Sequence, residues 1–199
     1  MKRTPRRLLA ALIAAAVPFA AGACIDPPPP PPPISTVDAQ YADLPTDNWV
    51  FLYDRRETGG QLSRFAQVFT AGRTGTLDKV SAIFGTHPFI PSSPVAPIVI
   101  TVRTLDAQGK PSGTILGQGE WNGPELPDEN TFADVPLTDT AEVEAGQQYA
   151  LVFESPSPVG MALYLDSPDY PGGGSFEGWP TESWLANPYD DVAFTTWVR

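Results

Sequence analysis

The segment PIVITVRTL, residues 97–105, carries the clearest structural signal in the sequence. Its apolar residues alternate with others, so that Ile98, Ile100 and Val102 would share one face of a β-strand. β-branched residues dominate the segment, and strands favour them because they pack well on a pleated surface. The pattern therefore predicts a strand with one face in a hydrophobic core.

Other segments with the same period of two surround this one. The clear ones are TLDKVSAIF (76–84), QQYALVF (147–153) and DVAFTTWV (191–198). Weaker candidates are WVFLY (49–53), RFAQVFT (64–70), TILGQGEW (114–121), TFADVPL (131–137) and GMALYLD (160–166). Gly and Pro residues between 105 and 116 predict a chain reversal. Because no window shows a capped helical period, we expect an all-β fold of about nine strands, an antiparallel two-sheet sandwich or jelly roll.

Several of these segments also resemble a known family. The resemblance lies in AQVFTAGRTGTLDKVSAIF (66–84), ITVRTLDAQGKPSGTIL (100–116), EAGQQYALVF (144–153), DYPGGG (169–174) and DVAFTTWV (191–198). Together they are similar to choice-of-anchor R, a family of extracellular bacterial β-sandwich domains, over most of residues 49–198. The resemblance implies an exported domain with a carbohydrate-binding-module-like sandwich, often joined to surface-attachment signals. The family has no agreed activity, so it supplies no catalytic residues.

The first 23 residues have the composition of a secretory signal. Four basic residues precede Leu8, an apolar run extends to Ala16, and Ala21-Gly22-Ala23 fits a small-residue cleavage site. A membrane-spanning helix is the weaker interpretation, because spanning takes about 20 apolar residues. We therefore expect residues 1–23 to be removed on export.

Cys24, the single cysteine of the chain, follows that cleavage site directly. This placement resembles the lipobox of bacterial lipoproteins, in which the cysteine becomes the acylated first residue of the mature chain. Ala21 departs from the Leu that is usual three residues before the cysteine, and ordinary secretion with a free thiol is the alternative. Lipidation explains why a lone thiol is present in an exported chain, and multiple acyl chains anchor a protein stably.

Seven prolines, Pro27–Pro33, follow the cysteine. Proline fixes φ and lacks an N–H, so the run predicts a polyproline II rod of roughly 20 Å or, alternatively, a disordered spacer. We assign residues 24–44 to the lipidated N-terminus and linker, and residues 45–199 to one β-sandwich domain.

The net charge of the chain disfavours some classes of binding partner. Without residues 1–23 the chain keeps eight of its 12 basic residues and all 23 acidic ones, which gives a net charge of −15. Such a protein repels phosphate backbones and anionic lipid surfaces, so nucleic acid is not an expected partner. The membrane is expected as a partner only through the N-terminal lipid.

Catalytic chemistry has little support in the sequence. His87 is the only histidine and lies in a Pro-rich stretch, no G-x-S-x-G motif is present, and zinc sites built from His and Cys are excluded by count. A hydrolase with paired carboxylates stays open, because 23 acidic residues offer many pairs. We expect a protein that is not an enzyme.

Calcium is the one metal that the sequence favours. It binds carboxylate and carbonyl oxygens, and acidic residues occur around flexible glycines and beside the last strand. The candidate ligands are Asp166, Asp169, Asp190 and Asp191. Turn-forming aspartates are the interpretation we favour, so we expect no cofactor and keep calcium as the alternative.

Aromatic residues concentrate in the late Gly- and Pro-rich segments. Sugars stack their C–H faces on exposed rings, while acids and amides bind their hydroxyls. The candidate ligand-binding residues are Tyr170, Trp179, Trp184, Asp169, Glu177 and Asn187. Alternatively, such rings fasten long loops to the sandwich by burying apolar area, and we favour this for Trp184.

Three classes of function follow from these features. The first is a binding module for glycan or another extracellular polymer, lipid-anchored in a bacterial cell envelope and facing outside the cytoplasm, or else secreted. The second is a structural or adhesive envelope module that binds protein or no ligand. The third is the hydrolase. We rank them in that order.

Overall fold

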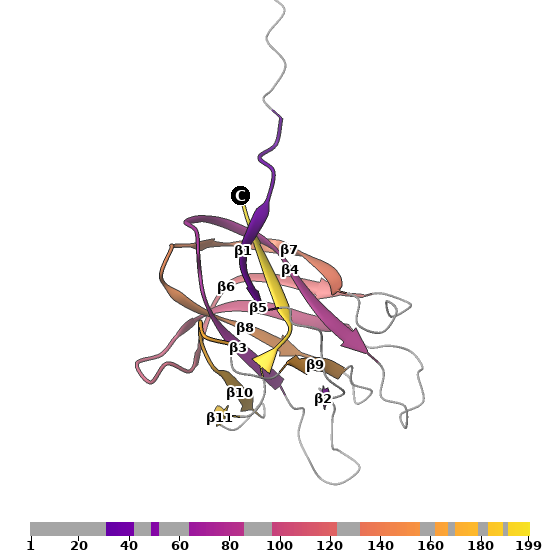
Figure 1. Ribbon diagram of the computed structural model, residues 1–199, viewed down its shortest axis with the longest axis vertical. Coiled ribbons are helices and arrows are strands. Elements are labelled where there is room, and N and C mark those ends of the chain that lie inside the picture. The colour runs from indigo at the N-terminus through magenta and orange to yellow at the C-terminus, as the bar shows by residue number, and fades with distance from the viewer. Residues whose placement is uncertain are drawn as a thin grey trace, which may run out of the picture. The chain divides into compact units, whose positions relative to one another are not determined.

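A computed structural model of the chain describes residues 31–41, 49–51, 64–85, 97–122, 132–155, 162–166, 170–178, 183–188 and 191–199. Pro33–Arg199 form one compact unit. Every regular element in the described residues is a β-strand (Figure 1), so the predicted all-β class is confirmed. None of these residues forms a helix with the length and hydrophobicity needed to cross a bilayer.

The strands form one antiparallel network. In chain order they are β1 (Thr36–Tyr41), β2 (Trp49–Phe51), β3 (Arg64–Thr70), β4 (Gly75–Gly85), β5 (Ile98–Leu105), β6 (Pro111–Trp121), β7 (Phe132–Val143), β8 (Gln148–Glu154), β9 (Ala162–Asp166), β10 (Ser175–Gly178), β11 (Leu185–Asn187), β12 (Asp191–Val192) and β13 (Phe194–Val198). Ten of them lie edge to edge in the order β1-β13-β4-β7-β6-β5-β8-β3-β10-β11. β9 pairs with the end of β4 and also with β2 and β12.

The sheet curls around a single main core, because strands far apart in its order share one hydrophobic cluster. From the β13-β4-β7 part come Phe194, Val198, Leu77, Val80, Phe84, Val135 and Val143. From the β5-β8-β3 part come Ile98, Ile100, Val102, Leu151, Phe153, Phe65 and Phe69. The inward faces that alternation gives to 76–84, 97–105, 147–153 and 191–198 all contribute residues to this cluster. Burial of a large aliphatic or aromatic side chain contributes about 1.5–3 kcal/mol, so this cluster is the main source of stability.

The two parts of the sheet join where β6 pairs with β7. The pairing is short, Gln118 with Asp139 and Gly119 with Leu137, and it contains a register shift. The backbones approach closely there: a Cβ on Gly119 would lie 2.6 Å from the Pro136 carbonyl oxygen, and one on Gly117 would lie 2.6 Å from that of Asp139. Glycine is therefore required in β6 at this junction.

A smaller cluster covers the opposite face of β3 and β8. Ala66, Val68, Ala150 and Val152 point away from the main core, and Trp184 packs on them. Thr101 and Arg103 of β5 also lie on this side and are buried. The face of these strands that points away from the main core is thus covered as well.

The turn between β5 and β6 confirms the predicted reversal. The Asp106 carboxylate accepts hydrogen bonds from the backbone N–H groups of Gln108 and Lys110, both at 2.9 Å. Gly109 has a φ of 75°, which favours glycine. A side-chain cap and a left-handed glycine together close the turn.

Three strands lie where the sequence analysis expected linker or loop. β1 falls inside residues 24–44 and pairs with β13, so the chain joins the sheet before residue 45. β10 and β11 fall in the late segments read as loops, and β10 pairs with the edge of β3. Short strands at a sheet edge bury few side chains, so their hydrophobic pattern is weak.

Candidate functional site

An outward-facing tryptophan lies on the sheet formed by β1, β13, β4 and β7. Trp197 points away from the main core because its neighbours Phe194, Thr196 and Val198 are buried. The ladder pairs Trp197 with Val37 on one side and with Lys79 on the other. Directly paired residues share a face. The partly exposed indole is therefore flanked by an aliphatic residue, 38% exposed, and a cation.

The next ladder row is polar. It pairs Thr195 of β13 with Ser81 of β4, and Ser81 with Asp134 of β7. We call Trp197, Lys79, Ser81 and Asp134 the Trp197 face. It spans three neighbouring strands and combines an aromatic ring with a cation, a hydroxyl and a carboxylate.

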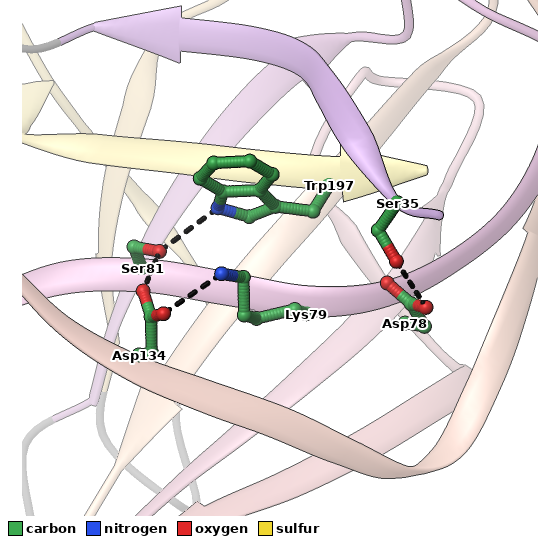
Figure 2. A network of polar contacts seen from close by, with 6 residues as sticks. All are labelled: Ser35, Asp78, Lys79, Ser81, Asp134 and Trp197. Atoms are coloured by element: carbon green, nitrogen blue, oxygen red, sulfur yellow. Dashed lines mark hydrogen bonds and ion pairs between the residues drawn. The ribbon is translucent and has the colours of Figure 1, made fainter. Parts of the chain in front are cut away.

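Hydrogen bonds connect all four side chains (Figure 2). The Trp197 Nε1–H donates to Ser81 Oγ at 2.9 Å, and the Ser81 hydroxyl donates to Asp134 Oδ1 at 2.6 Å. Lys79 Nζ donates to the other carboxylate oxygen of Asp134 at 2.7 Å and lies 3.8 Å from the centroid of the Trp197 ring. The indole is thus held in one orientation, and a charge-assisted bond places the ammonium over it.

Solvent reaches this network from the Asp134 side. The Asp134 side chain is 58% exposed and that of Lys79 is 24% exposed. Partial burial raises the pKa of Asp134, but hydrogen bonds from Lys79 and Ser81 and the charge of Lys79 outweigh it, so that the net pKa lies below its usual range. The carboxylate is therefore ionised at neutral pH and has lone pairs open to a ligand.

A second carboxylate close by holds the two ends of the domain together. Ser35 Oγ donates to Asp78 Oδ2 at 2.6 Å, as Figure 2 also shows, and Arg199 Nε lies 3.4 Å from the same oxygen. Ser35, just before β1, therefore lies near Arg199, the residue that follows β13. The described residues just before β1 thus lie on the same group of strands as the Trp197 face.

The described members of the predicted ligand-binding set, Tyr170, Trp184, Glu177 and Asn187, do not gather in one open site. Tyr170 is half-buried against the main core, with ring centroids 5.2 Å from Phe194 and 5.6 Å from Tyr41. Burial raises the pKa of its hydroxyl, and the charges of Asp38 and Asp191 raise it further. Its ring packs as part of the fold.

Trp184 belongs to the other cluster, on the opposite face of β3. It is 6% exposed, and the Arg64 guanidinium carbon lies 4.2 Å from its ring centroid. Lys110 Nζ donates to the Trp184 carbonyl oxygen at 2.9 Å. This is the arrangement of a ring that fastens its segment to the sheet.

Glu177 and Asn187 do lie together. They stand on the paired strands β10 and β11, where Asn187 Nδ2 donates to Glu177 Oε1 at 3.1 Å. Trp179 and Asp169, the other two predicted members of this group, lie outside the described residues. Within the described part, the pair is a cross-strand contact at the sheet edge.

Of the candidate calcium ligands, Asp191 is buried and fully used by the fold. Its two carboxylate oxygens accept hydrogen bonds from Gln67 Nε2 at 2.8 Å and from the Tyr170 N–H at 2.7 Å. Gln67 Oε1 in turn accepts from the Val192 N–H at 2.8 Å. Asp166 ends β9, and Asp169 and Asp190 lie outside the described residues. The described residues contain no group of three His, Cys, Asp or Glu placed to hold a metal ion.

Cys24 and His87 also fall outside the described residues, so the predictions of lipidation and of a loop histidine stay predictions. The Trp197 face, by contrast, is described but was missed in the sequence. The signal was present: the alternation in DVAFTTWV that places Phe194 and Val198 inward also places Trp197 outward. Its partners come from strands more than 50 residues away in the chain, so only the sheet order reveals them.

The chain matches no protein-family model, and a search of curated proteins finds no significant relative. Its resemblance to choice-of-anchor R domains therefore stays a prediction.

Proposed function

We propose that this protein is a non-catalytic, lipid-anchored protein of a bacterial cell envelope, and that its β-domain binds a glycan polymer at the Trp197 face. The Trp197 face runs across three neighbouring strands, from Trp197 on β13 to Asp134 on β7, which suits an extended chain better than a compact ligand. A partly exposed indole offers the apolar surface that Lys79 does not cover to sugar C–H groups, and Asp134 and Lys79 offer an acceptor and a donor to the hydroxyls.

The observation that carries this proposal is the partial exposure of the indole within a fixed polar frame. A ring that is already held loses little freedom when a ligand binds, which favours affinity. The net charge of −15 without the leader disfavours polyanions, so the expected polymer is neutral.

We further infer that the curled sheet acts as two layers of a jelly-roll sandwich, β13-β4-β7 facing β5-β8-β3. Support comes from the shared core cluster and from the short glycine-containing junction between β6 and β7. Membership of the choice-of-anchor R type is part of the same proposal and rests on the sequence motifs alone.

The anchor is tested through Cys24. We expect Cys24→Ser to release the protein from the membrane fraction, because a lipidated cysteine with more than one acyl chain anchors stably. Detergent-phase partitioning that is the same in variant and wild type would contradict acylation and favour the secreted alternative.

A glycan array tests the binding proposal. We expect the wild-type protein to bind at least one neutral polysaccharide, and Trp197→Ala to weaken that binding about tenfold, with and without calcium. Trp197→Phe is the matched control and should keep part of the affinity. Absence of any glycan binding would favour the structural or adhesive module, and turnover of a bound glycan would favour the hydrolase.

A further inference from the structure

An open hollow of about 730 Å³ lies at the ends of β3 and β5, beside the turn that leads into β8. Its lining residues are Thr70, Thr104, Leu105, Glu144, Gly146, Gln147, Gln148 and Tyr149. The volume falls in the range of small-molecule sites, about 300–1,000 Å³. None of these residues belongs to the Trp197 face.

One wall of the hollow is a rigid turn. Gln147 N donates to Glu144 O at 3.0 Å, and Gly146 between them has a φ of 81°, as a type II turn requires. The turn is fastened to Ala71 by two backbone bonds, Gly146 N to Ala71 O at 2.7 Å and Ala71 N to Gln147 O at 2.9 Å. Ala145 N also donates to Thr74 Oγ1 at 3.0 Å. This wall is therefore formed before any ligand arrives.

Gly172 fixes two side chains of the lining. Thr70 Oγ1 and Gln148 Nε2 both donate to the Gly172 carbonyl oxygen, at 2.7 and 3.1 Å. On the opposite side, Thr104 Oγ1 lies 2.6 Å from Ser112 Oγ. Gly172, two residues after the predicted ligand-binding Tyr170, thus borders the hollow through its backbone carbonyl.

Two polar side chains of the lining, those of Glu144 and Gln147, are available to a ligand. Among the described residues, no hydrogen bond or ion pair engages the Glu144 carboxylate or the Gln147 side-chain amide. The Glu144 N–H donates to the Tyr149 hydroxyl at 3.0 Å, which leaves the carboxylate outside the turn's own bonds. Leu105 adds an apolar wall. Its side chain is half-buried and packs against the smaller cluster, the one that contains Trp184. The hollow therefore offers mainly acceptors beside one apolar surface.

We propose that this hollow is a second binding site that takes a single sugar ring. A sugar donates hydroxyls to the Glu144 carboxylate and the Gln147 amide oxygen and lays an aliphatic face on Leu105. Two fixed walls reduce the ordering cost of binding. Binding in the hollow does not require a polymer on the Trp197 face, since the two sites share no residue.

The test is an NMR titration of the purified protein with methyl glycosides of glucose, galactose and mannose and with N-acetylglucosamine, at millimolar concentration. We expect one of these probes to shift the amide resonances of Gly146, Gln147 and Gln148. The near-isosteric Glu144→Gln should raise the Kd roughly tenfold because it replaces a charge-assisted hydrogen bond with a neutral one. Gln147→Ala should raise the Kd by roughly three- to tenfold because it removes one neutral hydrogen bond.

Trp197→Ala is the matched control and should leave this Kd unchanged. Both hollow variants change exposed side chains outside the turn's backbone bonds, so a thermal melt like that of wild type is expected and checks their folding. The proposal is overturned if none of the four probes shifts the hollow resonances, or if Trp197→Ala weakens the binding and the hollow variants do not. Failure of polymer binding alone would count only against the Trp197 face.

Discussion

The described residues include two tryptophan–cation pairs that differ in how deeply the tryptophan ring is buried. Arg64 stacks on Trp184 and Lys79 on Trp197, with 4.2 and 3.8 Å to the ring centroids. Trp184 is nearly inaccessible, whereas Trp197 keeps part of its surface in solvent. The first ring therefore stabilises the fold, and the second is available to a ligand.

Replacing each ring with alanine should distinguish the ring that stabilises the fold from the ring that is available to a ligand. Trp184→Ala removes a buried aromatic side chain and should lower the free energy of unfolding by about 3–5 kcal/mol. Trp197→Ala removes a partly exposed ring and should cost less, about 1 kcal/mol, the typical effect of a single substitution. Urea denaturation measures both values. A larger loss for Trp197→Ala would mean that this ring serves mainly the fold.

The ion pair on the Trp197 face predicts a pH dependence. Because the folded pKa of Asp134 lies below its unfolded value of about 3.9, the carboxylate stabilises the folded state above that pH. The contribution is lost as pH falls through the folded pKa. The side chain is 58% exposed, so the effect should be below about 1 kcal/mol.

Asp134→Asn tests this by denaturation at several pH values. The variant should be less stable than wild type at pH 7, and the difference should shrink below about pH 4, where the wild-type carboxylate also loses its charge. A difference that grows on acidification has the opposite sign and would contradict the ion pair.

At the scale of the element, hydrophobic alternation predicted the strands that have one face buried in the core. All nine predicted segments contain a strand, and the inward residues of the four clearest ones are buried. The short strands β1 and β10 were not predicted because they bury only a few side chains. The Trp197 face escaped for another reason: a single strand reveals that Trp197 points outward, but not which strands lie beside it.

The β6–β7 junction can be tested with two glycines of the same strand. Gly119→Ala places a Cβ 2.6 Å from the Pro136 carbonyl oxygen and should cost about 1–3 kcal/mol through backbone displacement. Gly113→Ala meets nothing within 4 Å and should be neutral or slightly stabilising. Equal effects in thermal melts would show that the close approach does not govern the curl of the sheet.

At the scale of the whole molecule, charge and attachment set the conditions for binding. Without residues 1–23, the proposed leader, the chain carries a net charge of −15, so attraction to the proposed neutral polymer depends on contacts rather than on long-range steering. Asp78 binds Ser35 and Arg199, which places the proposed tether and the chain end at one point of the domain. A proline rod of roughly 20 Å at that point would hold the domain away from the membrane.

The central claim is that a neutral glycan polymer binds at the Trp197 face, and NMR of the purified protein with such a polymer tests it most directly. We expect the Trp197 indole resonance and the amides of Lys79, Ser81 and Asp134 to shift on titration, and the shifts to vanish in Trp197→Ala. Polymer binding that leaves the Trp197 indole resonance in place would contradict the claim.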